Sequence, residues 1–292
     1  MVLVEVVKIW EGPAQLGESP LWNPDLQVLY WLDIEKSRLY ARTEGTGTVN
    51  GINLPAMAGS VALCAEGGLV AAIGRGFAHV EPMTGEVRML ATDIAREDCL
   101  MNDGKADRRG TFIAGAKHLP ESDPVASVWS FTHGRISPVM DHFTVFNGPA
   151  FSPAGDRVYF ADSPTQQIKT ATYDAETGAF GPFEVFAQLG EGDGYPDGMT
   201  VDADGCLWNA HWDGWRLTRY RPDGTIDRVV EIPVQRPTSL CFGGPEMTSI
   251  FVTSASTRMT AQELANAPAS GALFRIETDI RGLAETPVSI EG

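Results

Sequence analysis

The sequence predicts an all-β fold, a six-bladed β-propeller, and three observations carry this prediction. A phrase made of an apolar start, a turn of Pro, Asp or Gly and a second apolar run recurs six times along the 292 residues. Successive copies begin about 40 to 50 residues apart, which is the period of four-stranded propeller blades. Helical periodicity is confined to one short stretch near the C-terminus.

The six copies share turn chemistry, because Asp-Gly, Gly-Gly, Ala-Gly-Asp or Arg-Arg-Gly supplies the positive φ that closes a hairpin. In chain order they are LWNPDLQVLYWLDI (21–34), ALCAEGGLVAAIG (62–74), KADRRGTFIAGA (105–116), FSPAGDRVYFADS (151–163), TVDADGCLWNAHW (200–212) and LCFGGPEMTSIFVTSA (240–255). Segments 134–146 and 227–235, which lie between copies, also have strand character. The one expected helix lies at 260–268 with Thr260 as its cap. No linker divides the chain, so we expect residues 1–292 to form a single domain.

Composition narrows the classes of partner. The net charge of −16, with no basic cluster to offset it, argues against nucleic acid and anionic membranes as partners. The four cysteines lie far apart and form no C-x-x-C pair, so we expect buried free thiols. The first twelve residues contain an early acid and no long apolar run, which argues against a signal peptide or a membrane span and favours a cytoplasmic location.

Side chains that carry oxygen precede or open several of the repeats, each flanked by Gly or Pro. They are Glu18 in LGESPLW, Asn102 and Asp103 in MNDGKAD, Asn147 in FNGPAFSP and Asp197 in YPDGMTVD. Because they occupy equivalent places in different blades, we expect them to meet at one end of the central channel. Carboxylate and amide oxygens are the ligands that a hard divalent cation selects.

Turn formation is the competing explanation for each of these residues taken alone, because Asp, Asn and Gly favour turns for local reasons. It accounts well for Asp202, Asp204 and Asp223, which lie in the hairpin tips of VDADG and RPDG. It accounts poorly for Glu18, because Glu does not form turns. It also does not predict oxygen donors placed systematically before the apolar runs.

Five blocks of the sequence resemble, in order and spacing, the SMP-30/gluconolactonase/regucalcin-like family. They are LGESPLWNPDLQVLYWLDI, NDGKADRRGTFIAG, FNGPAFSPAGDRVYFADSP, YPDGMTVDADGCLWNAHWDG and RPTSLCFGGP. The resemblance spans nearly the whole chain. It implies a six-bladed propeller that opens a sugar lactone to the free acid with one divalent cation in its central channel.

Carried over by position, the resemblance makes Glu18, Asn147 and Asp197 the protein ligands of the cation. Asn102 then lies close by, in contact with the substrate or a water on the cation, and Asp103 follows it in the same turn. Oxygen ligands favour Ca²⁺, Mg²⁺ or Mn²⁺, with Ca²⁺ expected first, and Zn²⁺ and Fe²⁺ remain alternatives. We expect Asp197 either to take the proton from the attacking water or to orient a water activated by the cation.

The substrate-facing loop departs from the family pattern at two positions. Many relatives have Arg where this chain has Leu100, and Met where it has Lys117. We hypothesise that Lys117 supplies the cation missing at Leu100 and changes the substrate preference; the alternative is a solvated lysine on a loop rim. Glu121 is the nearest match to the family's acidic residue that holds sugar hydroxyls, and His118 lies in the same loop.

Other chemistries fit less well. No G-x-S-x-G motif occurs, and no two of the five histidines have H-x-x-x-H spacing. His211, Trp212 and Trp215 lie in a run where a ligand contact is possible, although packing between blades explains tryptophan equally well. Three alternatives to the lactonase stay open: a scaffold that binds protein partners, a calcium-binding regulatory propeller without catalysis, and a phosphotriesterase-like hydrolase using the same cation. The sequence leaves open the lactone, its ring size and the oligomeric state.

Overall fold

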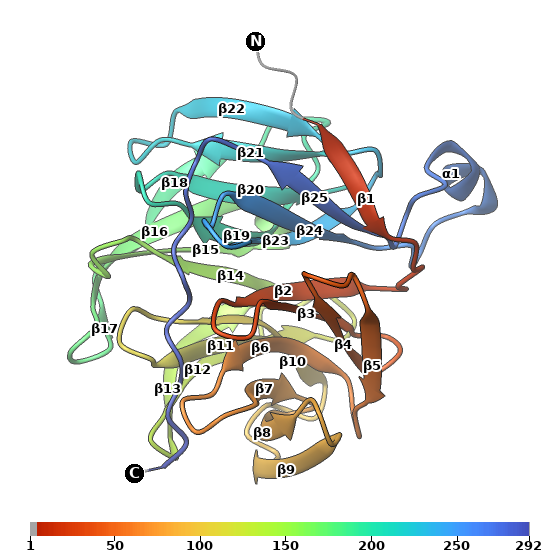
Figure 1. The fold of residues 1–292 in the computed structure, drawn as a ribbon. Coiled ribbons are helices and arrows are strands. Elements are labelled where there is room, and N and C mark those ends of the chain that lie inside the picture. Colours follow the sequence, from red (N-terminus) through yellow and green to blue (C-terminus); the bar gives the residue numbers. More distant parts are fainter. Residues whose placement is uncertain (1–4, 292) are drawn as a thin grey trace.

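The six predicted repeats form the blades of a β-propeller in the computed structural model, which describes residues 5–291 (Figure 1). Each blade is an antiparallel sheet, and blades are numbered here in chain order. Blade 1 is β2 (Gly17–Asn23), β3 (Val28–Asp33), β4 (Arg38–Thr43) and β5 (Val49–Asn53). Blade 2 is β6 (Ala58–Leu63), β7 (Leu69–Ile73), β8 (Gly76–Glu81) and β9 (Glu86–Ala91). Blade 3 is β10 (Cys99–Ala106), β11 (Phe112–His118), β12 (Ala126–Thr132) and β13 (Arg135–Phe143).

The other three blades follow the same plan with two variations. Blade 4 has five strands: β14 (Phe146–Phe151), β15 (Arg157–Asp162), β16 (Gln167–Asp174), β17 (Ala179–Phe180) and β18 (Glu184–Gln188). Blade 5 is β19 (Tyr195–Val201), β20 (Leu207–Trp212), β21 (Arg216–Tyr220) and β22 (Ile226–Glu231). Blade 6 is β23 (Pro237–Gly243), β24 (Ser249–Ser254), β25 (Leu273–Glu277) and β1 (Val6–Trp10).

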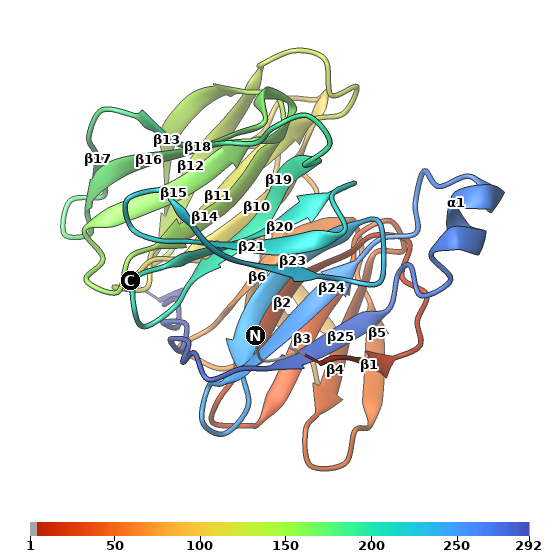
Figure 2. The same cartoon turned by 90° about the horizontal axis from the view of Figure 1, so that it is seen from above.

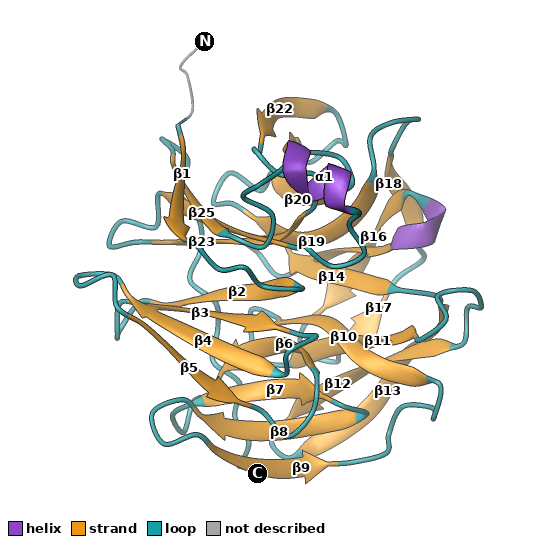
Figure 3. Ribbon diagram, turned by 90° about the vertical axis from the view of Figure 1, so that its right-hand side faces the viewer, coloured by secondary structure: helices purple, strands orange, loops and turns teal. Residues whose placement is uncertain are grey.

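The recurring phrase of the sequence is the first hairpin of each blade, so the prediction of an all-β, six-bladed propeller is confirmed. The expected strand segments are also confirmed, as β13 and β22. The expected helix is α1 (Ala261–Asn266), where Thr260 and Glu263 form a capping box, and Figure 3 shows how little other helix accompanies the strands. The prediction that residues 1–292 form one domain remains a prediction.

The ring is closed by β1, which joins the last blade rather than the first. Val6 lies opposite Ile276 and Trp10 opposite Leu273, and Figure 2 shows β1 beside β25. The Trp10 ring also packs edge-on against Trp31 of blade 1 at 5.2 Å between centroids. Backbone pairing on one side and aromatic packing on the other therefore join the two ends of the ring.

A C-terminal strap, residues 278–291, crosses the propeller after β25 and runs to the C-terminus beside blade 3 (Figure 1). Backbone hydrogen bonds connect it to blade 5 at Ala203, to blade 2 at Leu63 and to blade 3 at His133. Within the strap, Glu285 forms an ion pair of 3.3 Å with Lys105 of β10. Residues far apart in the sequence are thus tied across several blades.

Six strands surround the central axis, one from each blade, and each has an irregular register at a similar place. The breaks lie between Glu18/Leu21, Ala58/Ser60, Met101/Gly104, Asn147/Ala150, Pro196/Met199 and Pro237/Leu240. A β-bulge changes the direction in which a side chain points and is common beside active sites. The predicted oxygen-bearing residues lie at or within these bulges.

The four cysteines are free and buried, as predicted from their spacing. Trp22 and Trp208 are buried between blades, where Trp22 stacks on Phe251 and Trp208 meets Phe242 edge-on. Among the described residues there is no helix with the length and hydropathy of a membrane span. The first four residues of the N-terminal stretch considered above lie outside the described residues.

Candidate active site

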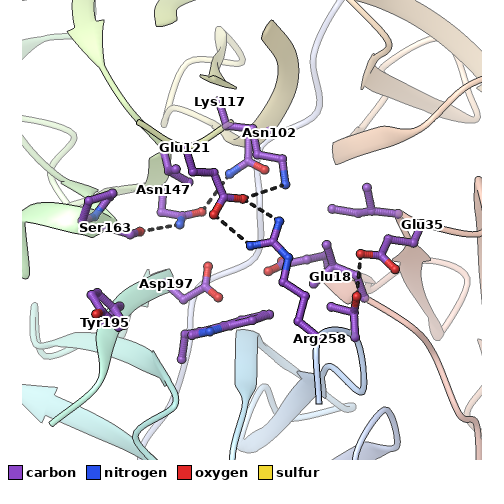
Figure 4. A pocket seen from close by; sticks show the side chains of 16 residues that line it. Glu18, Glu35, Asn102, Lys117, Glu121, Asn147, Ser163, Tyr195, Asp197 and Arg258 are labelled. Atoms are coloured by element: carbon purple, nitrogen blue, oxygen red, sulfur yellow. Dashed lines mark hydrogen bonds and ion pairs between the residues drawn. The ribbon is translucent and has the colours of Figure 1, made fainter. Parts of the chain in front are cut away.

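A cavity of about 310 Å³ opens at one end of the propeller axis (Figure 4). Five of the six blades or the loops that follow their strands contribute to its walls. The lining consists of Leu16, Glu18, Ile34, Glu35, Asn102, Lys117, Glu121, Val145, Asn147, Ser163, Pro164, Tyr195, Asp197, Trp212, Thr257 and Arg258. Blade 2 contributes no side chain because its innermost strand has Gly59 here, where a Cβ would lie 2.3 Å from the backbone oxygen of Asn102.

The most buried polar residues of the lining include Glu18, Asn147 and Asp197. They come from β2, β14 and β19, and their relative exposures are 6, 6 and 7 %. Figure 4 shows all three side chains at the same cavity, although they are far apart in the sequence. The bulges of three different blades therefore bring two carboxylates and one amide together.

The amide group of Asn147 has a fixed orientation. Its Nδ2 donates to Ser163 Oγ at 2.7 Å, and the Ser163 hydroxyl donates to the carbonyl oxygen of Pro196 at 2.6 Å. Asn102 Nδ2 donates to Asn147 Oδ1 at 3.1 Å and to the carbonyl oxygen of Phe146 at 2.9 Å. Since the nitrogen of Asn147 is held by Ser163, its oxygen is left to act as an acceptor within the cluster.

The carboxylates of the cluster repel one another, and the positive charge of Lys117 offsets this repulsion only in part. The pKa of Glu18 is raised well above its ordinary value by burial and by the negative charges of Asp197 and Asp103. The pKa of Asp197 is likewise raised by burial and by Asp103. Burial also raises the pKa of Asp103 to about 6. A cation placed between Glu18 and Asp197 would remove this repulsion.

The donor set fits a hard divalent cation. Within residues 5–291, no three His, Cys, Asp or Glu side chains gather into a metal-binding group. The amide oxygen of Asn147, which lines the same cavity, can serve as a third oxygen ligand beside the carboxylates of Glu18 and Asp197. Oxygen from Asp, Glu and Asn is the ligand type of Ca²⁺ and Mg²⁺, and three protein ligands leave coordination positions for other molecules.

The rim of the cavity carries charged side chains of both signs. Arg258 donates two hydrogen bonds to Glu121, of 2.8 Å to Oε1 and 2.9 Å to Oε2. Lys117 Nζ lies 3.9 Å from the same Oε1. Lys117 belongs to β11, is paired with Leu100 across the sheet, and is bridged through its backbone to Val145 of the next blade. Lys117 therefore lies in a strand rather than a loop, and its side chain is only 18 % exposed.

Asp103 and His118 are the two expected substrate contacts that the structure does not place in the cavity lining. The carboxylate of Asp103 accepts backbone hydrogen bonds from Gly104 N at 2.7 Å and from Gly148 N at 2.9 Å. His118 is buried, and its Nδ1 accepts from Asp123 N at 3.1 Å. Both side chains therefore accept hydrogen bonds from backbone N–H groups beside the cavity.

Of the residues in the NAHWDGW run that were considered as ligand contacts, some line the cavity and others do not. Trp212 lines the cavity, and the guanidinium of Arg236 lies 4.9 Å from the centre of its ring. His211 is buried outside the lining, with Nδ1 2.8 Å from the carbonyl oxygen of Asp193, and burial lowers its pKa to about 4. Trp215 lies outside the lining and is partly exposed. Only Trp212 is thus placed to meet a molecule in the cavity.

Sequence reasoning missed part of the lining. Glu35, Ser163 and Pro164 directly follow the second strands of blades 1 and 4, and the ends of those strands return to the face where the first strands begin. The place of these residues in the repeat, after the second strand of a blade, could therefore have indicated that they line the cavity. Thr257 and Arg258 lie in an irregular segment after β24, and nothing in the repeat indicates them.

Residues 16–256 match the family described as SMP-30/Gluconolactonase/LRE-like region. The chain is 32 % identical over 277 residues to a 6-deoxy-6-sulfogluconolactonase of Pseudomonas putida, with 94 % of both chains covered. It is 31 % identical to a pentonolactonase of Haloferax volcanii, covering 96 % of this chain and 97 % of the relative. A crystal structure of a calcium-binding protein, regucalcin, from Agrobacterium tumefaciens superimposes with a TM-score of 0.93 at 25 % identity, covering 98 % of this chain and 97 % of that one.

Proposed function

The chain belongs to the SMP-30/gluconolactonase family, and on that premise we propose that it hydrolyses a sugar lactone to the free sugar acid with one divalent cation. The observation that carries the proposal is the meeting of Glu18, Asn147 and Asp197 from three blades in one cavity. The cavity, of about 310 Å³, has the size of a small-molecule site. Two similar proteins are named as lactonases, which supports the same substrate class.

Glu18, Asn147 and Asp197 would hold the cation, and we propose Ca²⁺, with Mg²⁺, Mn²⁺, Zn²⁺ and Fe²⁺ as the alternatives to compare. When bound, such a cation polarises an ester carbonyl and makes water more acidic. Ser163 keeps the amide of Asn147 in the orientation that presents its oxygen. Asn102 donates to that oxygen from the other side.

Asp197 is the proposed catalytic base. Its carboxylate lies in the cavity beside the space for the substrate, where it can accept a proton from the water that attacks the lactone carbonyl. Asn102, Lys117 and Glu121 line the same cavity and are proposed to contact the substrate. Asp103 and His118 act through the backbone that they hold, as positioning residues.

A calcium-binding regulatory role without catalysis is the competing proposal, supported by the similarity to regucalcin. A phosphotriesterase-like activity would use the same oxygen cluster. We also propose a cytoplasmic location, a small-molecule partner rather than nucleic acid or membrane, and one domain over residues 1–292. The acidic net charge of −16 supports the exclusion of nucleic acid.

The test is hydrolysis of a panel of aldonolactones by the purified protein with added cation, after chelation, and after cation is restored. We expect turnover that chelation abolishes and that cation restores. Asp197→Asn should reduce kcat by about 100-fold or more. Asp223→Asn, which changes charge equally at an exposed hairpin tip, is the matched control. Cation binding with no turnover of any lactone would favour the regulatory role, and turnover unaffected by chelation would contradict the proposed site.

A further inference from the structure

The rim of the cavity brings two cationic side chains to a single oxygen atom. Arg258 donates to Oε1 of Glu121 at 2.8 Å, and Lys117 Nζ lies 3.9 Å from the same oxygen. Figure 4 shows both side chains reaching Glu121 from different elements, Lys117 from β11 and Arg258 from the segment after β24. One carboxylate thus faces two positive charges.

Charge in the cavity is unevenly divided. With a dication at Glu18 and Asp197, the base of the cavity is neutral. The net charge on the rim is +1, from the two cations Lys117 and Arg258 and the carboxylate of Glu121. Glu35 provides the remaining negative charge, and it accepts a 2.7 Å hydrogen bond from Thr257. The positive part of the lining is therefore centred on Lys117 and Arg258.

Lys117 is the best-placed of these cations to meet a ligand. Its side chain is only 18 % exposed, and it lines the cavity. At 3.9 Å from Glu121, it is too distant for a hydrogen bond, and none joins its ammonium to any residue within 5–291. The pairing of β11 with β10 and the bridge to Val145 fix its backbone. A largely buried ammonium with free donors is suited to bind an anionic group.

The contact between Arg258 and Glu121 can exchange for another. The Arg258 side chain is 58 % exposed and that of Glu121 is 30 % exposed. Because both side chains reach solvent, an incoming anion can replace the Glu121 carboxylate on the guanidinium without leaving either group buried and unpaired. A guanidinium binds carboxylate, sulfonate and phosphate oxygens with the same two-pronged geometry.

We propose that Lys117 and Arg258 form an anion subsite, and that the preferred substrate is a lactone with an anionic group remote from the ring ester. Glu121 takes the place of that group when the cavity holds no substrate. The shared chemistry is an oxyanion, which a carboxylate or a phosphate monoester can provide. The inference rests on the proposed lactonase function and adds the substrate class to it.

Two matched pairs of lactones test the proposal in the cation-loaded protein. D-Galactono-1,4-lactone and D-galactaro-1,4-lactone differ in having a hydroxymethyl group or a carboxylate at the end of the chain. D-Glucono-1,5-lactone and its 6-phosphate form the second pair and separate phosphate from carboxylate. We expect kcat/KM to be at least 10-fold higher for the charged member of at least one pair.

The variants Lys117→Met and Arg258→Gln should each reduce the charged-to-neutral ratio of kcat/KM by about 10-fold. Lys8→Met is the matched control, because it removes one positive charge from β1, outside the cavity, and should leave the ratio unchanged. Thermal unfolding of each variant reports whether it folds. Binding of D-galactonate and galactarate by calorimetry gives a second ratio that does not depend on turnover.

The possible results separate the two proposals. Hydrolysis of neutral lactones with no preference for either charged member, or a preference that survives in both variants, overturns the anion subsite and leaves the lactonase intact. Absence of hydrolysis of every lactone overturns the proposed function. In that case, tighter binding of galactarate than of galactonate, lost in both variants, supports the subsite, and equal binding overturns it.

Discussion

Asp197→Asn is expected to have opposite effects on the protein without and with its cation. Asp197 and Glu18 are buried close together, and their pKa values are raised by burial and by nearby negative charge. A carboxyl group whose pKa is higher in the folded protein stabilises the fold below its ordinary pKa, and this contribution is lost as the pH rises. The cation-free wild type should therefore lose stability between acidic pH and pH 8. The variant, which has lost one of the charges, should lose less and unfold at a higher Tm at pH 8.

The cation should reverse this order. At a concentration 100 times its Kd, a ligand of the folded state adds about 2.7 kcal/mol to the free energy of unfolding. For a chain of 292 residues, that corresponds to an increase of about 4 to 5 °C in Tm. Asp197→Asn removes one of the two charged ligands and should weaken binding by about 100-fold or more, so its Tm should change little at the same concentration.

Thermal unfolding followed by circular dichroism at pH 5 and pH 8, with chelator and with Ca²⁺ or Mn²⁺, measures all four conditions. Asp223→Asn serves again as the control for the change in charge, because Asp223 is exposed in a hairpin tip. The reasoning would be refuted if the cation raised the Tm of wild type and Asp197→Asn equally. It would also be refuted if the variant were less stable than the wild type at pH 8 without the cation.

Three further substitutions probe the support of the site and of the fold. Ser163→Ala removes the acceptor of Asn147 Nδ2. Cation affinity, measured by calorimetry with Mn²⁺, should fall by about 10-fold. Unchanged affinity would show that this hydrogen bond does not orient the amide. Arg219→Met removes the guanidinium partner of the Asp202 carboxylate, which has no exposed surface. The free energy of unfolding, measured in urea, should fall by about 3 to 5 kcal/mol. A loss below about 1 kcal/mol would contradict this expectation. Gly198→Ala would place a Cβ 2.1 Å from a hydroxyl oxygen of blade 6 and should cost about 1 to 3 kcal/mol by the same measurement, and a variant as stable as the wild type would show that the blades can separate here.

The repeat in the sequence predicts the blades because each first hairpin has its own turn chemistry and apolar runs, which are local properties. The same repeat brings Glu18, Asn147 and Asp197 to equivalent places, so their presence in one cavity follows from the fold. The bulges that direct these side chains were not predicted, because a register break depends on the partner strand.

Other features depend on contacts between distant parts of the chain. The pairing of β1 with β25 closes the ring, but no feature of residues 6–10 distinguishes a strand of the last blade from one of the first. Arg258 reaches the cavity from an irregular segment without repeat character. Asp103 was expected to face the cavity, yet its two backbone hydrogen bonds hold it on the other side of the same bulge.

The cation site itself is tested most directly by anomalous diffraction from a crystal of the wild-type protein soaked in Mn²⁺. The account predicts one strong peak in the cavity, at about 2.0 to 2.6 Å from oxygen atoms of Glu18, Asn147 and Asp197 together. A peak at another place, or none in the cavity at a Mn²⁺ concentration that stabilises the protein, would contradict it.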